Sequence, residues 1–578
     1  MRVPRVSVPV LSRPVLIPRF RRADPEASDH QGPAANVRRQ RRQRRLTRHL
    51  GALSPIAAMR QVVLSRPLTR PLWRIGRAPV ATGVSVAPGE DVVLELPSGA
   101  SSSRHAIPAG ARSGVRRLGL SEDMPAKALQ RRVLSLSAPA IGEQLLALGV
   151  GLSDTFLSGH LSSHASAVLG YGQATAVAAV GAAGMVSWVV LSSFFAVNVG
   201  VTALVARATG ARDTNLATRA VVQGIIMSSI IGLALIALAV PMADLITVAL
   251  GVNGQVASLA AQFIRVSSLG MPGAGIASAC TAAMRGSGDT RRPMLVMLVV
   301  NGVNVAASWL LLNGDAQLGI PPVGVTGSAI GAASGWTLGA VLAFFLLTRT
   351  HPLAPRITGA AIRFDRQIAL RVLRVGLPSA AELLVFQMGV LTFNRQVVGL
   401  GATRYAANIT INTIESVGTL PAFGFSVAAT ALVGQALGAK SPKLAERSTL
   451  AAFWPCLGLM VALGSLALLL PQLLLSIFIA DPTVLHAGAT AMRVSMIILP
   501  ASGAAFIFNG ALRGAGDTKF PVIVRAAGSW GLRVPLAALL IPLLGLPGGR
   551  IAMALDFCAQ AGLSYWRFRS GKWRKARV

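Results

Sequence analysis

Long apolar segments recur along most of this chain, and they decide what it can fold into. Between about residues 133 and 566, roughly a dozen segments of about 20 to 30 residues are dominated by apolar side chains. Each is long enough to cross a ~30 Å hydrocarbon core as a helix. Helices satisfy their own backbone hydrogen bonds in lipid, whereas barrel strands would appear as short alternating segments. We therefore predict an all-α membrane protein.

The connections between these segments alternate in charge. The first, third and fifth connections contain neither Lys nor Arg, whereas the second, fourth, sixth, eighth and tenth carry basic clusters. Basic residues near the ends of spans are retained in the cytoplasm. The alternation predicts twelve spans, with both chain ends and every even-numbered connection inside.

The second half of the chain repeats the first. TALVARATGARDTNLATR, from Thr202, aligns without a gap with TALVGQALGAKSPKLAER, from Thr430. AMRGSGDTRRP, from Ala283, matches ALRGAGDTKFP, from Ala511, at the same spacing. Halves of six spans each have the same orientation and are related by a pseudo-twofold axis along the membrane normal. Two six-helix lobes with a cleft between them form the architecture of a transporter.

This organisation gives predicted boundaries. We expect an N-terminal lobe over residues 124–348 and a C-terminal lobe over residues 367–568. A cytoplasmic connection over residues 349–366 joins them, and residues 569–578 form a basic cytoplasmic tail.

The repeated polar connections have a structural interpretation. Their glycines permit a tight turn after a span, and their aspartates can cap the next helix. We therefore expect the residues of both turns to fold the cytoplasmic helix ends without touching substrate: Arg285, Gly286, Asp289, Arg513, Gly514 and Asp517.

Residues 1–123 form a basic arm with 22 arginines and no span. Their composition predicts disorder. An extension upstream of a natural start at Met124, an organellar transit peptide and a polybasic patch on anionic lipid remain alternatives. Because no aromatic residues are interleaved for base stacking, we expect no specific nucleic-acid partner.

Metal and enzyme chemistry have little support in the sequence. The three cysteines lie in or beside apolar segments without paired spacing, and the seven histidines show no ligand spacing. The spans contain no nucleophile and base constellation, and there is no Walker-type loop. We predict no metal, no cofactor and no enzyme activity.

Several motifs together resemble the multidrug and toxic compound extrusion (MATE) family of secondary efflux transporters. They are the pair ALVARATGA and ALVGQALGA, the two RG-G-DT-P connections, GLSDTFLSG, PVGVTGSAIGAA and the terminal RFRSGKW, and they extend over about residues 130 to 574. The resemblance implies two six-helix lobes around a cleft. It also implies export of organic cations and other amphipathic compounds in exchange for protons or sodium ions.

The predicted coupling-ion site is Asp154 with Asn304. An ionisable residue inside a span costs at least ~3 kcal/mol at the helix centre, so each is a functional candidate. Asp154 lies late in the first span and matches the acidic position that the family uses for protonation. Asn304, in the fifth span, is expected to hydrogen-bond toward it. The alternative is that Asp154 caps a hydrated helix end.

Five further polar residues are candidates for the substrate cleft: Glu143, Glu382, Glu415, Gln387 and Asn198. Glu143 and Glu382 occupy matching positions, and either face each other across the cytoplasmic closure or help to pack kinked helices. A separate acid in the last span, Asp556, is predicted to pair with Arg533 or Arg525.

Departures from the family pattern affect the choice of branch and ion. The NorM-like branch carries acids in the seventh and tenth spans, but LLVFQMG around Phe386 and PASGAAFIFNG around Ala504 contain none. This favours the DinF-like branch. The archaeal pattern of Asn followed four residues later by Asp becomes Asn304 and Ser308, so a proton is the expected ion and sodium stays open.

The leading hypothesis is therefore a monomeric, proton-coupled efflux antiporter in contact with membrane lipids. We expect it in the plasma (inner) membrane, or in an organelle envelope if the arm is a transit peptide. A flippase for a lipid-linked precursor and a membrane scaffold that acts through the arm are the alternative functions.

Overall fold

The computed structural model describes residues 122–351 and 363–576. Most of the predicted arm and of the connection between the lobes, and the last two residues of the tail, lie outside these ranges. All described residues belong to one compact unit. They form helices, with an isolated bridge between Asp315 and Ile320 and no strand among the residues described. The all-α prediction is confirmed.

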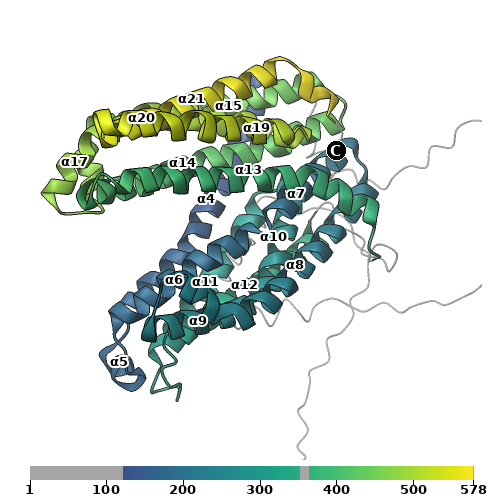
Figure 1. Cartoon of the computed structure of the whole chain (residues 1–578). Coiled ribbons are helices and arrows are strands. Elements are labelled where there is room, and N and C mark those ends of the chain that lie inside the picture. Colours follow the sequence, from purple (N-terminus) through teal and green to yellow (C-terminus); the bar gives the residue numbers. More distant parts are fainter. Residues whose placement is uncertain (1–121, 352–362, 577–578) are drawn as a thin grey trace, which may run out of the picture. The chain divides into compact units, whose positions relative to one another are not determined.

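The helices form two lobes that are consecutive in sequence (Figure 1). The N-terminal lobe consists of α4 (Ala126–Gly159), α5 (Ser163–Leu169), α6 (Gln173–Ser192), α7 (Phe195–Ala211), α8 (Thr214–Ala249), α9 (Gly254–Ser268), α10 (Met271–Gly286), α11 (Arg291–Asn313), α12 (Val325–Phe345) and η3 (Leu346–Thr350). The C-terminal lobe consists of α13 (Arg366–Val398), α14 (Ala402–Gly438), α15 (Pro442–Leu469), α16 (Pro471–Ser476), α17 (Pro482–Arg493), α18 (Ser495–Ala515), α19 (Lys519–Ala526), η4 (Ala527–Arg533), α20 (Val534–Leu544), α21 (Leu546–Arg569) and η5 (Lys572–Lys575).

Nine helical segments of the described chain are long and apolar enough to cross a membrane. The twelve-span layout also needs α9 with α10, α13 and α21. The first of these passes is divided near Gly270 into helices of 15 and 16 residues. The other two carry charged side chains, among them Glu382 in α13 and Arg550 in α21. The short helices α9 and α10, and the polar helices α13 and α21, are therefore not among the nine segments, although the twelve-span layout needs them as three spans.

The sequence repeat is also a repeat of atomic contacts. Thr202 Oγ1 donates to the carbonyl oxygen of Ala282 at 3.1 Å, and its counterpart Thr430 donates to that of Gly510 at 2.9 Å. The counterpart turn residues Gly288 and Gly516 both adopt left-handed conformations, with φ of 86° and 88°. The two halves thus fold in the same way where their sequences match.

Reciprocal contacts join the two lobes at the end of the helices that carries the basic connections. A Cβ atom added at Gly210 would collide with the backbone of Gln435, and one at Gly438 would collide with that of Arg207. Gly210 and Gly438 are repeat counterparts, as are Arg207 and Gln435. Contacts that map onto each other under exchange of the halves are the mark of a twofold relation. Small residues allow this close helix approach in membranes.

The first helix of each lobe packs against the other lobe. In α13, Val372 joins Val197 and Val201 of α7 in one core cluster. In α4, Val133 joins Ala428 and Ala429 of α14 in another. The lobes therefore share apolar cores. The predicted lobe boundaries stay predictions, because this packing does not divide the described chain at those positions.

Candidate functional site

Asp154 lies near the carboxyl end of α4, where three helices of the N-terminal lobe meet. Its side chain is buried, and Oδ1 accepts hydrogen bonds from Asn304 Nδ2 of α11 at 3.2 Å and from Ser328 Oγ of α12 at 3.1 Å. Within the described residues it has no ion pair with a basic side chain. The carboxylate is therefore held by neutral donors only.

Close packing between α11 and α12 places these donors. In α12 a glycine occurs at every fourth position, from Gly327 to Gly339. A Cβ at Gly331 would meet Ser308 and the backbone of Asn304, and one at Gly335 would meet the carbonyl oxygen of Val300 at 2.7 Å. A stripe of small residues lets two helix backbones approach. Ser328 lies beside this stripe and so comes within hydrogen-bond distance of Asp154.

Other polar atoms extend the site. Ser308 Oγ donates to the carbonyl oxygen of Ser328 at 3.3 Å. Asn304 Oδ1 is buried and has no hydrogen-bond partner among the described residues. An oxygen acceptor without a partner next to a carboxylate favours a proton or a small cation at this position.

Glu143 and Glu382 form ion pairs inside their own lobes and do not pair with each other. Glu143 pairs with Arg285. Glu382 lies 3.4 Å from Arg513 and 3.5 Å from Arg525. Both carboxylates are buried. Each therefore joins the middle of its first helix to the arginine of its own RG-G-DT turn, which fits the packing alternative.

Glu415, a predicted cleft residue, lies in a buried polar network. Its Oε2 accepts from Arg550 Nη1 at 2.8 Å, and its Oε1 accepts from Ser495 Oγ at 2.5 Å. Arg550 also donates to the side chains of Asn408 and Asn412. The guanidinium neutralises the carboxylate, which removes the charge that would attract a cation.

Asn198 and Gln387 are both partly buried, on α7 and α13. Asn198 Oδ1 is a buried acceptor without a partner among the described residues. No hydrogen bond of the described chain connects either residue to the network around Asp154. The structure thus does not bring them together with the predicted ion site.

The six predicted turn residues lie at equivalent ends of α10 and α18. Gly286 and Gly514 sit in the final helical turns, where an added Cβ would collide with the carbonyl oxygens of Thr202 and Thr430. The φ angles above place the left-handed glycine two residues later in each turn. The arginines, Arg285 and Arg513, point to the glutamates described above.

The two turn aspartates differ. Asp289 Oδ1 accepts from the backbone N–H groups of Arg291 and Arg292 at 3.1 and 3.2 Å, which caps α11. Asp517 forms an ion pair with Arg567 at 2.8 Å, and no side chain caps α19. Asp289 also pairs with an arginine, because its Oδ2 lies 2.5 Å from Arg292 Nη1, but that arginine is in the first turn of α11 and leaves Oδ1 in the capping position.

His351, at the edge of the described connection, packs against the first turn. Its Nε2 atom lies 3.0 Å from Ser287 Oγ and 3.8 Å from Asp289 Oδ2. Burial lowers the pKa of His351 to about 4, although the nearby Asp289 carboxylate opposes this shift. The imidazole is therefore neutral at physiological pH.

Sequence reasoning missed Ser328, Arg550 and Gln435. The glycine stripe of α12 was a signal for Ser328, because a hydroxyl beside it must meet the neighbouring helix. Arg550 lies in an apolar segment and therefore requires an acidic partner, but the sequence does not show which acid that is. Gln435 Nε2 donates to the carbonyl oxygen of Gly286 at 2.9 Å across the lobes, a contact that no local pattern indicates.

Comparisons with known proteins cover both lobes. The MatE family model matches residues 139–310 and 378–539, more than half of the chain. A probable multidrug resistance protein NorM from Thermotoga maritima is 30% identical over 453 residues, which cover 78% of this chain and 94% of that protein. A probable NorM from Rhodopseudomonas palustris is 28% identical over 408 residues, with coverage of 68% and 84%.

Solved structures show the same fold. A MATE protein crystallised in the bent conformation has a TM-score of 0.70 and 22% identity, over 79% of this chain and 97% of that one. An outward-facing multidrug resistance MATE family transporter of the MOP superfamily has a TM-score of 0.68 and 22% identity, over 76% and 95%.

Proposed function

Because this chain belongs to the MatE family of multidrug and toxic compound extrusion transporters, we propose that it is an antiporter that exports organic cations or amphipathic compounds in exchange for protons. It is an integral multi-pass membrane protein and not an enzyme. The relatives are named as multidrug resistance proteins, which supports the substrate class. Placement near the DinF-like branch stays a prediction.

One observation carries this proposal: among the buried carboxylates of the described chain, Asp154 is the one without an arginine partner. Glu143, Glu382, Glu415 and Asp556 each pair with an arginine. A paired carboxylate keeps its charge neutralised by protein. A carboxylate held by neutral donors must acquire its positive partner from outside, as a proton or a cation.

Exchange follows from competition for this one charge. When Asp154 is protonated, it no longer attracts a cation. When it is ionised, the buried negative charge favours a bound cation, and Asn304 and Ser328 hold the carboxylate in place. A proton that arrives from one side can thus release a cation that was bound from the other.

Alternating access would use the reciprocal contacts between the lobes. The contacts of Gly210 and Gly438 close the side that carries the basic connections, which the charge pattern assigns to the cytoplasm. Opening this side would require the paired contacts to separate together. The twofold relation makes such a rocking motion of one lobe against the other a simple one.

The coupling is tested in everted vesicles with an imposed proton gradient. Addition of a cationic dye is expected to dissipate the gradient as dye accumulates in the lumen. Replacing sodium by choline should leave the rate unchanged. If accumulation of the dye requires sodium and does not require a proton gradient, the ion assignment is wrong. If no cationic dye accumulates, the proposed function fails.

Gly210→Ala is expected to slow this transport. The added Cβ meets the Gln435 backbone, and overpacking of about 1–3 kcal/mol lowers the closed population by roughly 5- to 150-fold. Alanine favours the helix itself, so a weaker α7 cannot explain the loss. Dye efflux and thiol labelling from the cytoplasmic side measure the effect.

The matched control is Gly184→Ala in α6, where an added Cβ meets nothing within 4 Å. This variant should transport like the wild type. Equal rates for Gly184→Ala and Gly210→Ala would contradict the role of the Gly210 contact in closure.

We further propose a location in the plasma membrane, in line with the bacterial relatives, and a monomeric state. The predicted lobe boundaries are part of the same proposal, since each lobe contains one of the two family matches.

A further inference from the structure

Two arginines share one glutamate in the C-terminal lobe. Glu382 Oε2 lies 3.4 Å from Arg513 Nη1, and its Oε1 lies 3.5 Å from Arg525 Nη2. Both contacts are longer than a good charged hydrogen bond of about 2.7–2.9 Å. One carboxylate between two guanidiniums leaves one positive charge without compensation.

The N-terminal lobe shows what the same turn needs for folding. There Glu143 pairs with Arg285 alone, in a close hydrogen bond. In the aligned turn motifs, Met297 is the counterpart of Arg525, and it is buried. A single arginine is therefore sufficient to anchor the first helix to the turn. The second arginine of the C-terminal lobe exceeds that structural requirement.

Neighbouring carboxylates are already neutralised by other arginines. Asp556 pairs with Arg533 at 2.5 Å and accepts from Gln560 at 2.5 Å. Glu415 pairs with Arg550 at 2.8 Å. The buried acids of this lobe therefore do not supply the missing negative charge.

Arg525 is buried and has donors to spare. It is 5% exposed, and its Nε and Nη1 atoms have no hydrogen-bond partner among the described residues. It lies in α19, roughly 9 Å along the helix from Lys519. A buried cation at this depth is expensive unless something compensates its charge.

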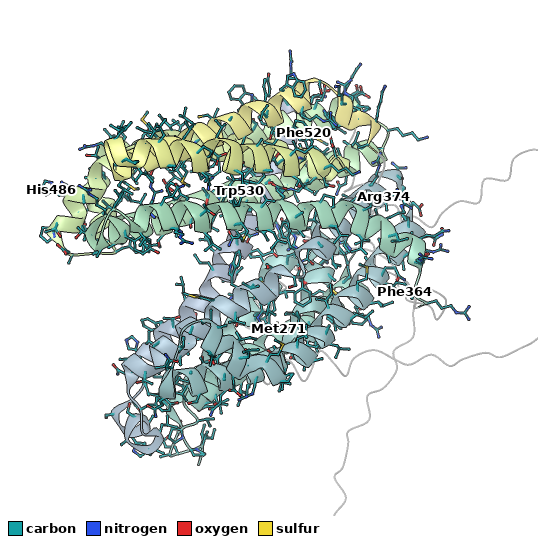
Figure 2. All side chains as sticks on the ribbon, viewed as in Figure 1. Met271, Phe364, Arg374, His486, Phe520 and Trp530 are labelled. Atoms are coloured by element: carbon teal, nitrogen blue, oxygen red, sulfur yellow. The ribbon has the colours of Figure 1, made fainter. Side chains whose placement is uncertain are left out.

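Aromatic rings surround the guanidinium. The Arg525 Cζ atom lies 4.7 Å from the ring centroid of Phe386 in α13 and 5.9 Å from that of Phe506 in α18. Phe423 of α14 stacks obliquely on Phe506, with ring centroids 4.4 Å apart, and is partly exposed. Trp530, labelled in Figure 2, donates to the carbonyl oxygen of Val385 at 3.3 Å, next to Phe386.

We propose that this cluster is a binding subsite for an organic anion. Arg525 keeps free donors on two edges of its guanidinium, Nε–H on one and Nη1–H on another, and either can donate a charge-assisted hydrogen bond to an oxygen of a carboxylate or sulfonate. Phe386, Phe506 and Phe423 provide the surface for an aromatic body attached to that group.

The subsite is independent of the proposed proton coupling. Asp154 and its partners lie on α4, α11 and α12, whereas this cluster lies on α13, α14, α18 and α19. The two proposals are tested by different experiments. A failure of the proposed function would be detected in the vesicle assay with a cationic dye, whereas a failure of this inference would be detected in a binding assay with an anion.

Binding of naphthalene-2-sulfonate to the full-length protein in phosphatidylcholine nanodiscs, measured by calorimetry, tests the proposal. The Arg525→Met variant has the same residue as the equivalent position of the N-terminal lobe, Met297, and lacks the positive charge of the arginine. We expect roughly 10- to 150-fold weaker binding of the sulfonate to it, as for loss of charge-assisted hydrogen bonds. Arg525→Lys, which keeps the charge but loses the planar guanidinium and its separate donors, should bind with intermediate affinity.

Arg395→Met is the matched control, because it removes an exposed arginine from α13 by the same substitution. It should bind the sulfonate like the wild type. A control ligand, 2-naphthylmethylammonium, has the same aromatic body with the opposite charge, and its affinity should not depend on Arg525.

Several results would overturn the proposal. They are absence of sulfonate binding to the wild type, equal binding by Arg525→Met, and failure of Arg525→Met to fold, which would make Arg525 a structural counter-ion of Glu382. Loss of sulfonate binding in nanodiscs that contain phosphatidylglycerol would instead identify the occupant as a lipid headgroup.

Discussion

Asp154→Asn is expected to abolish proton-coupled export while the protein still folds and inserts. Asparagine has nearly the same shape, and it can still accept hydrogen bonds from Asn304 and Ser328, whose donors now lie 3.2 and 3.1 Å from Oδ1. It cannot bind a proton or attract a cation. Loss of a charge-assisted interaction weakens cation binding by roughly 10- to 150-fold.

The measurement is dissipation of a proton gradient by a cationic dye in everted vesicles, normalised to the amount of inserted protein. Asp244→Asn is the matched control, because Asp244 is an exposed acid of α8 that pairs with Arg265. This control should retain the wild-type rate. Transport by Asp154→Asn at the wild-type rate would show that the coupling carboxylate lies elsewhere.

Arg550→Leu is expected to destabilise the protein more strongly than other single charge removals. It leaves the Glu415 carboxylate buried and without its counter-ion, and loss of one partner of a buried pair costs about 3–5 kcal/mol. It also removes the donors to Asn408 and Asn412. The free energy of unfolding, from denaturation in mixed micelles, should fall by this amount.

The double variant Arg550→Leu with Glu415→Leu separates the unpaired charge from the lost packing. Replacing both members of a buried pair by apolar residues is often close to neutral, so the double variant should recover about 2 kcal/mol or more. Arg265→Leu is the control at an exposed pair, where the cost should stay below ~1 kcal/mol. If the double variant is no more stable than Arg550→Leu, the isolated charge is not the cause.

Much of the fold could be predicted because its signals are local. Apolar runs identify spans by length alone, and the matching segments from Thr202 and Thr430 predict two equivalent halves. Details of the helices followed less well. The helix break near Gly270 and the presence of charged side chains within α13 and α21 depend on tertiary contacts. A charged side chain is tolerated in a span where it has a partner inside the lobe.

The candidate site was predicted in part. Asp154 and Asn304 stood out because acids and amides are rare in spans, and the structure places them within hydrogen-bond distance. The role in the substrate cleft that we expected for Glu415 would require its carboxylate to have no basic partner in the protein. The partner that neutralises it, Arg550, is 135 residues away in sequence.

By itself, the sequence determined that the chain is a membrane bundle of two repeated halves, because hydropathy and repeated polar turns are properties of neighbouring residues. Among the described residues, only the tertiary structure decided which buried carboxylate has no basic partner and which arginine must share its carboxylate with a second arginine. Charge compensation inside lipid depends on side chains from helices that lie far apart along the chain, and no local pattern specifies which of them meet.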